Sequence, residues 1–274
     1  MIDLHFIAGG ALVGFIVGAT GVGGGSLMTP LLTLVFGVPA QVAVGTDLLF
    51  ASVTKANGAW AHAKRGSVDW PITGWLVAGS VPAALATLVT VHQLNLDPRH
   101  FNAFISHALG AALVLTALAL LYKDRIVALG QSFAPAPQTL GLATDCGSVA
   151  MPANDGARPL PTLAIGILIG VLVTLTSVGA GVIGVVALFF LYPQLAARRI
   201  VASDIAHAVP LTLVAGLGHA SLGTVNWTML VSLLIGSLPA ILLGTALAHR
   251  LPERGLRVFL AAMLILIGAR LVLG

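Results

Sequence analysis

The feature that most limits how this chain can fold is a series of long apolar segments separated by short polar or glycine-rich stretches. Of the 274 residues, 58% are hydrophobic and 8% are charged, and the mean hydropathy is +1.03. A soluble domain carries about 25% charged residues. Because lipid offers the backbone no hydrogen-bond partners, apolar segments of this length cross it as helices. The sequence therefore predicts an all-α polytopic membrane protein.

Ten apolar segments follow one another along the chain, at 4–20, 26–37, 45–64, 70–91, 100–122, 161–176, 181–192, 201–221, 227–248 and 255–273. The second and the seventh are short, since a helix of twelve residues spans about 18 Å of a hydrocarbon core about 30 Å thick. We expect segments 1 with 2, and 6 with 7, to form broken or re-entrant helices. The sequence leaves open whether these pairs re-enter or span fully.

The first of these breaks is the stretch GATGVGGGSLMTP at 18–30. Each glycine costs about 1 kcal/mol relative to alanine inside a helix, so the cluster predicts a helix end. Ser26 stands at an N-cap position before an apolar run. The free N–H groups of a helix beginning there would favour an anion. A weaker copy, TLTSVGAGVIG, occupies 174–184.

The chain is predicted to contain an internal duplication. His62, Gly66, Trp70, Gly79, Ser80, Pro82 and Ala83 correspond at a spacing of 157 residues to His219, Gly223, Trp227, Gly236, Ser237, Pro239 and Ala240. The glycine clusters align at a spacing of 156. Each copy holds five segments, an odd number, so the second copy is expected to be inverted in the membrane. The predicted division is a first repeat at 1–122, a cytoplasmic linker at 123–160 and a second repeat at 161–274.

The basic residues predict the orientation in the membrane. Most fall in links on one side: Lys64, Arg65, Lys123, Arg125, Arg198, Arg199, Arg250, Arg254 and Arg257. By the positive-inside rule that side is cytoplasmic, which places both termini outside the cell's inner (plasma) membrane. Arg99 and Arg270 are exceptions. The linker is rich in Pro, Ala, Gly and Ser, and Cys146 within it has no intrachain partner because it is the only cysteine.

Lys55 is the most informative charged residue. It lies eight residues after Asp47 and nine before Lys64, about 12 to 14 Å from each by helix rise, near the middle of the membrane. A lysine at this depth is costly unless it faces a cavity or a counter-charge. An anion pathway would supply both, while a structural pair with Asp47, Asp204 or a backbone carbonyl is the alternative. Thr212 stands at the matching position of the second half.

The two glycine breaks supply the other candidate substrate-binding groups. Hydroxyls and helix-end N–H groups there could replace the water shell of an anion, although such hydroxyls also satisfy broken backbone. The candidates are Thr20, Gly23, Gly24, Gly25, Ser26, Lys55, Thr176, Ser177, Gly179 and Gly181.

Three further residues are candidates for coupling to an ion. Asp47 and Asp204 follow Thr46 and Ser203 at the expected starts of two segments. Helix capping explains an aspartate at such a place without any transport role. Coupling to a proton or sodium ion is the other interpretation. His207 stands three residues after Asp204, where it could relay a proton or be a buried, hydrogen-bonded histidine.

Other functional classes find no support in the sequence. There is no nucleophile with a matching base, no phosphate loop and no cofactor fingerprint, so we predict neither an enzyme nor a cofactor. The histidines lack metal-ligand spacing, so no metal is expected. The formal net charge of +4 reflects membrane topology, and no nucleic-acid partner is predicted.

Three stretches resemble the TauE/SafE sulfite exporters, also called the TSUP family. They are GATGVGGGSLMTPLL, VGTDLLFASVTKANGAWAHAKRGSVDW and SDIAHAVPLTLVAGLGHASLGTVNW, and the likeness covers nearly the whole chain outside 123–160. The second break departs from the pattern, since Ser177 and Ala180 replace glycines and Val186 replaces Pro30. The resemblance implies a small duplicated membrane protein that exports or takes up sulfite, thiosulfate, sulfonates or related organic anions.

Together these observations predict a secondary transporter for a small sulfur-containing oxyanion, sulfite-like or an organosulfonate. It would work by alternating access through rocking of the two halves, and export is the expected direction. The expected partners are the small anion, a coupling proton or sodium ion and the lipid bilayer. The alternatives are an uncoupled anion channel and a non-transporting membrane partner protein. The exact substrate, the coupling ion and the oligomeric state are not determined by the sequence.

Overall fold

The computed structural model describes residues 3–20, 25–93, 98–132, 158–247 and 253–273, and in these ranges it contains helices and no β-strand. The helices in chain order are α1 (Leu4–Thr20), α2 (Gly25–Leu34), α3 (Ala40–Lys64), α4 (Trp70–Gln93), α5 (Pro98–Ser132), α6 (Pro159–Thr176), α7 (Val182–Leu191), α8 (Ala197–Ser221), α9 (Trp227–Leu247) and α10 (Glu253–Leu273). By length and composition, five of these described helices could cross a membrane: α4, the 102–122 part of α5, α6, α8 and α9. The prediction of an all-helical membrane protein is confirmed.

Three helices, α3, α5 and α8, extend well beyond the apolar segments that predicted them. α3 begins at Ala40 and α8 at Ala197, ahead of the predicted 45 and 201, and α5 continues to Ser132. Residues 123–132 of the predicted linker are therefore helical, and 133–157 lie outside the described residues. The differences have one cause. The segments were delimited by hydrophobicity, whereas a helix continues into polar sequence wherever its backbone hydrogen bonds can still form.

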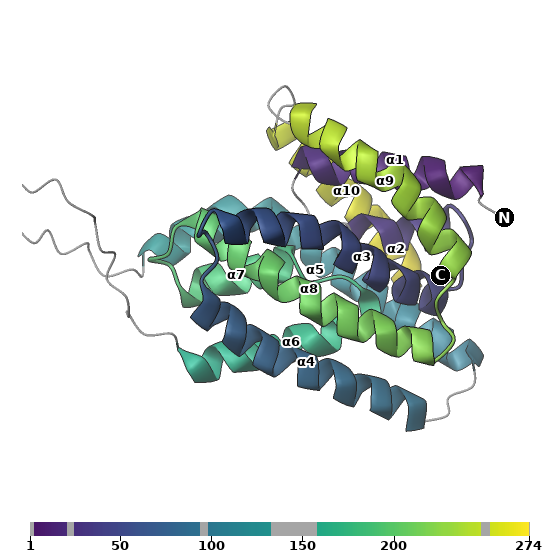
Figure 1. The fold of residues 1–274 in the computed structure, drawn as a ribbon, viewed down its shortest axis with the longest axis horizontal. Coiled ribbons are helices and arrows are strands. Elements are labelled where there is room, and N and C mark those ends of the chain that lie inside the picture. Colours follow the sequence, from purple (N-terminus) through teal and green to yellow (C-terminus); the bar gives the residue numbers. More distant parts are fainter. Residues whose placement is uncertain (1–2, 21–24, 94–97, 133–157, 248–252, 274) are drawn as a thin grey trace, which may run out of the picture.

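The most extensive helix pairs each combine one helix from either half of the chain. α1 lies along α9 and α4 lies along α6, at opposite edges of the bundle, and α3 packs against α8 between them (Figure 1). α5 packs against α10 in the same way. The two halves of the sequence are thus interleaved in space, and the interior of the bundle is formed jointly by both.

Glycines bring the outer helix pairs into backbone contact. A Cβ atom at Gly14 of α1 would lie 2.7 Å from the Cα of Ser237 on α9, and one at Gly170 of α6 would lie 2.8 Å from the Cα of Ser80 on α4. Such distances leave no room for a side chain. The two contacts are equivalent, because the glycines are 156 residues apart and the serines 157.

The turns that follow α3 and α8 are anchored in the same reciprocal way. The N–H of Asp69 donates to the hydroxyl of Ser203 at 2.8 Å, and the N–H of Asn226 donates to the hydroxyl of Thr46 at 3.1 Å. The side chains of Asp69 and Asn226 then each accept from the N–H three residues further on, at 3.3 and 3.0 Å. Each turn therefore caps its own following helix and is held by a helix of the other half.

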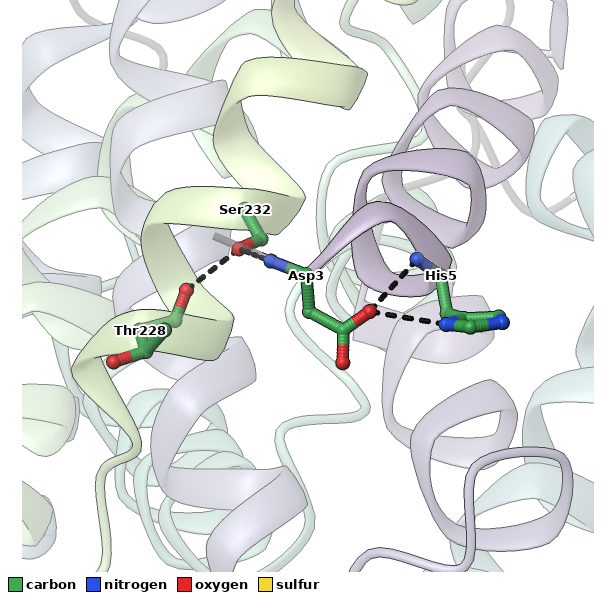
Figure 2. Close-up of polar contacts among 4 residues, drawn as sticks. All are labelled: Asp3, His5, Thr228 and Ser232. Carbon is green, nitrogen blue, oxygen red and sulfur yellow. Dashed lines mark hydrogen bonds and ion pairs between the residues drawn. The ribbon is translucent and has the colours of Figure 1, made fainter. Parts of the chain in front are cut away.

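The beginning of α1 is fastened to α9 (Figure 2). The N–H of Asp3 donates to the hydroxyl of Ser232 at 3.3 Å, and that hydroxyl donates to the carbonyl of Thr228 at 2.8 Å. The Asp3 carboxylate accepts from the backbone N–H of His5 and bonds its ring nitrogen Nδ1, both at 3.0 Å. These hydrogen bonds, the backbone one foremost, lower the pKa of the Asp3 carboxyl. Asp3 thus serves as the N-cap of α1.

Candidate functional site

The second glycine-rich stretch forms an irregular connection inside the bundle. α6 ends at Thr176 and α7 begins at Val182. Between them φ is +58° at Ser177, +121° at Gly179 and +145° at Gly181, and Ser177 is the only non-glycine residue with positive φ in the described part of the chain. A left-handed backbone at a residue with a side chain costs of order 1 kcal/mol and is concentrated at functional sites. We call residues 177–181 the second break.

The hydroxyl of Thr176 is engaged in holding this break together. It donates to the carbonyl of Leu172 at 2.7 Å and accepts from the N–H of Val178 at 3.2 Å. Ser177 differs, because its buried hydroxyl has no hydrogen-bond partner among the described residues. Of the two hydroxyls predicted here, Thr176 satisfies the backbone and Ser177 remains available.

Lys55 reaches the second break from α3. Its ammonium nitrogen donates to the carbonyl of Ala180 at 2.7 Å. Within the described ranges it forms no ion pair, and it lies in electrostatic range of Asp204 and Asp47. An ammonium group has three N–H donors, so one carbonyl leaves two of them for other partners. Of the predicted alternatives, the direct partner is the backbone carbonyl.

Capping is not the role of Asp47 or Asp204. α3 starts at Ala40 and α8 at Ala197, so both aspartates lie about two turns inside their helices. The N-cap residues are Pro39 and Ala196, and neither makes a side-chain cap. The capping interpretation was wrong because it took the start of the apolar segment as the start of the helix.

Asp47 is a buried connection between α3, α2 and the second break. Its side chain is 0% exposed, and one carboxyl oxygen, Oδ2, accepts from the hydroxyl of Thr29 on α2 at 2.5 Å. The hydroxyl of Ser177 lies close to the same carboxyl, without the geometry of a hydrogen bond. The other oxygen, Oδ1, has no partner among the described residues.

Asp204 is equally buried but has no such donor. It is 1% exposed, and its oxygen Oδ1 accepts no hydrogen bond from the described residues. The carboxyl rests against the first turn of α7 at Gly184, where an added Cβ atom would overlap Oδ1. Gly184 is therefore required for Asp204 to occupy this position.

His207 lies one turn further along α8, on the same face as Asp204. It is 0% exposed, and its nitrogen Nε2 is 2.9 Å from the hydroxyl of Ser80 on α4. Its other ring nitrogen, Nδ1, has no partner in the described part of the protein. The interpretation as a buried histidine with a hydrogen bond is confirmed for one nitrogen, and the second remains unpaired.

The first break contributes less that can be described. Gly23 and Gly24 lie outside the described residues, as do the side chains of Thr20 and Ser26, and Gly25 is the first residue of α2. The part of this break in an anion site stays a prediction.

Sequence reasoning missed three residues of this region. Thr29 and Ser80 hold Asp47 and His207, and Gly184 makes room for Asp204. The sequence does contain hints of two of them, since Thr29 flanks the first break and Ser80 matches Ser237 at the spacing of 157 residues. Their partners could not be identified, since these contacts join different helices. Within the described ranges, no group of three or more His, Cys, Asp or Glu side chains could hold a metal ion.

Comparison with known proteins gives a consistent result. The model of the family described as "Sulfite exporter TauE/SafE" matches residues 6–271. The chain is 34% identical over 270 residues to the "Probable membrane transporter protein YjnA" of Bacillus subtilis (strain 168), covering 98% of this chain and 100% of that protein. A "Probable membrane transporter protein" of Xylella fastidiosa (strain Temecula1 / ATCC 700964) is 28% identical over 246 residues, covering 89% and 84%. No solved structure matches this chain.

Proposed function

The chain belongs to the sulfite exporter TauE/SafE family of membrane transporters, and from this we propose that it is a secondary transporter for a small sulfur-containing oxyanion. The substrate is sulfite-like or an organosulfonate, and it crosses the cell's inner membrane by alternating access. Export is the direction that the family's name supports. The protein works in the lipid bilayer, and a proton or sodium ion is the proposed coupling ion.

The observation that carries this proposal is the contact between Lys55 and the second break. A charged ammonium group held by one neutral carbonyl at 2.7 Å leaves a local positive charge inside the bundle, with two donors to spare. The hydroxyl of Ser177, which has no hydrogen-bond partner among the described residues, and the irregular backbone at Gly179 and Gly181 lie near that carbonyl in sequence. These groups can bind a small anion by replacing the water molecules around it. In this proposal Thr176 maintains the shape of the break.

The first break completes the proposed site from the other half. Its groups are Thr20, Gly23, Gly24, Gly25 and Ser26, of which Thr20 ends α1 and Gly25 begins α2. Asp47, Asp204 and His207 are the candidates for the coupling site. All three are buried, and each has one side-chain atom without a partner in the described part of the protein.

We further propose that residues 1–122 and 161–274 are inverted repeats with both termini outside. The support is a set of equivalent contacts at the repeat spacing: Gly14 with Ser237 and Gly170 with Ser80, and the anchored turns at Asp69 and Asn226. The packing also indicates which bodies move. Rocking one half against the other would separate α1 from α9 and α4 from α6, the most extensive contacts. We therefore take these mixed pairs as the rigid units.

Transport by a Lys55→Ala variant tests the proposal. Purified protein is reconstituted in liposomes, and uptake of labelled sulfite is measured against concentration. Losing a hydrogen bond to a charged group costs about 1.5–3 kcal/mol, so the apparent affinity should fall about 10- to 100-fold. Lys64→Ala is the matched control, because Lys64 lies at the end of the same helix over the ring of Trp60, 3.7 Å from its centroid. It should transport like the wild type.

Equal transport by the Lys55→Ala and wild-type proteins would remove Lys55 from the site. The same assay with thiosulfate, sulfate and sulfonates, with and without a pH gradient, identifies the substrate class. Accumulation above the equilibrium level in a pH or sodium gradient indicates coupling. Flux that only dissipates the anion gradient would replace the transporter by an uncoupled channel.

A further inference from the structure

The two aspartates at matching positions of the repeat have different surroundings. Asp47 is bonded to Thr29, but the residue that corresponds to Thr29 at the spacing of 156 is Val185, which has no hydroxyl. Asp204 accepts no hydrogen bond from the described residues and lies against the backbone of α7 at Gly184. The duplicated framework thus holds one carboxyl with a dedicated donor and one without.

On the basis of the proposed transport function, we propose that Asp204 is the binding site of the coupling proton and that Asp47 is a structural residue. A buried carboxylate without hydrogen bonds is far less stable than a protonated carboxyl in the same place. Thr29 reduces this penalty for Asp47. Asp204 lacks that support, so it is the carboxyl whose charge depends on what else occupies the site.

The surroundings of Asp204 favour a proton over a metal cation. Metal cations are held in proteins by several oxygen ligands. Two oxygens of this region already have partners, since the Ser80 hydroxyl bonds to His207 and the Ala180 carbonyl accepts from Lys55. Lys55 also repels a cation at this place. A proton needs only one carboxyl oxygen.

Few charged groups face Asp204 from the helices packed against α8. α3 contributes Lys55 and Asp47, and α8 itself contributes His207. α6 and α7 contain no titratable residue, and α4 has only His92 in its last turn. Among the described residues, the positive charge that acts on Asp204 inside the bundle is therefore that of Lys55.

This arrangement couples the proton to the anion. In the empty site the charge of Lys55 stabilises the Asp204 carboxylate. An anion bound at Lys55 offsets that charge, the carboxylate loses its stabilisation, and Asp204 takes a proton from water on the side to which the site is open. A monoanion and one proton then leave together on the other side. The loaded and the empty site carry the same net charge, so the net direction follows the sum of the anion and proton gradients.

Proton uptake on anion binding tests the assignment. Purified protein in weak buffer with a pH-indicator dye is titrated with sulfite and, separately, with thiosulfate, which takes up no proton near neutral pH. The wild-type protein should take up about one proton per bound thiosulfate, by linkage. Asp204→Asn should bind the anion with no such uptake. Asp47→Asn, the same chemical change at the equivalent position, should keep the wild-type proton-to-anion ratio.

Infrared difference spectra provide a test that does not require the Asp204→Asn variant to fold. Asp47 and Asp204 are the only buried carboxyls in the described part of the chain. In Asp47→Asn, a carboxylic acid band that appears on anion binding therefore reports Asp204. The inference is overturned if that band is absent, or if Asp204→Asn takes up protons like the wild type. If the wild-type protein neither binds nor transports any of the anions, the proposed function itself fails.

Discussion

Buried hydroxyls in this protein mostly serve the backbone. Thr162 donates to the carbonyl of Arg158 at 2.7 Å, and the Tyr192 hydroxyl accepts from the N–H of the same residue at 2.9 Å, which joins the start of α6 to the end of α7. Against this background four side chains stand out, because each has a buried polar atom with no partner among the described residues: Asp47, Ser177, Asp204 and His207. Each such atom costs about 1–3 kcal/mol, so their gathering around Lys55 supports a binding role.

The pairing of Asp47 with Thr29 gives a prediction for stability. Thr29→Val keeps the shape of the side chain but removes the donor to a buried carboxyl, so the free energy of unfolding should fall by about 1–3 kcal/mol. The measurement is thermal or denaturant unfolding in detergent. Thr33→Val is the control, because the Thr33 hydroxyl donates to carbonyls of its own helix, at 3.1 Å from Thr29 and from Pro30. Equal losses in the two variants would contradict a special role for Thr29.

At the scale of helices, packing between α1 and α9 and between α4 and α6 depends on small residues. Without a solvent-driven hydrophobic effect between helices in lipid, close backbone approach supplies the contact energy. Gly14 and Gly170 provide that approach at equivalent places. The two outer pairs are therefore the parts of the bundle in which an added side chain has least room.

Alanine substitutions test this packing. Gly14→Ala and Gly170→Ala place a Cβ atom against the neighbouring backbone, and overpacking of this kind costs about 1–3 kcal/mol. Gly74→Ala is the control, since a Cβ atom at Gly74 of α4 meets no atom within 4 Å. It should be neutral or stabilising, by up to about 1 kcal/mol. The measurement is the melting temperature of each purified variant. If Gly74→Ala lowers it as much as Gly14→Ala does, tight packing at Gly14 is not the cause.

At the scale of the whole molecule, the interleaving of the halves restricts the motion that transport can use. Each extensive helix pair takes one helix from either half, as the paths of α1 and α9 in Figure 1 illustrate. A movement that keeps these pairs intact separates no backbone contact at Gly14 or Gly170. Movement between mixed pairs is therefore less costly than movement between sequence halves.

A disulfide across α1 and α9 distinguishes the two motions. The N–H of Asp3 lies 3.3 Å from the Ser232 hydroxyl, so the two residues are in direct contact across α1 and α9. Asp3→Cys with Ser232→Cys, in a Cys146→Ser background without the native cysteine, should form the bond on oxidation and transport sulfite at the same rate before and after. Uptake that stops on oxidation and returns on reduction would show that α1 and α9 move apart.

Much of the fold could be predicted because hydrophobic length reports helices directly. The expected segments at 70–91 and 227–248 match α4 and α9 closely. The starts of α3 and α8 and the end of α5 could not be predicted in this way, since hydropathy marks the apolar part of a helix and not its hydrogen-bonded ends. The assignment of Asp47 and Asp204 to helix caps failed for this reason.

For the candidate site, too, some features could be predicted from the sequence and others depended on the tertiary structure. That Lys55 needs a polar partner could be predicted from the sequence, because a lysine within an apolar membrane segment is costly without one. Which partner it meets was decided by the tertiary structure, since the carbonyl of Ala180 lies 125 residues away in the chain. The unequal surroundings of Asp47 and Asp204 have the same origin. The two aspartates match at a spacing of 157 residues in the sequence. The tertiary structure places Thr29 beside Asp47 and Gly184 beside Asp204, and among the described residues only Asp47 receives a hydrogen bond.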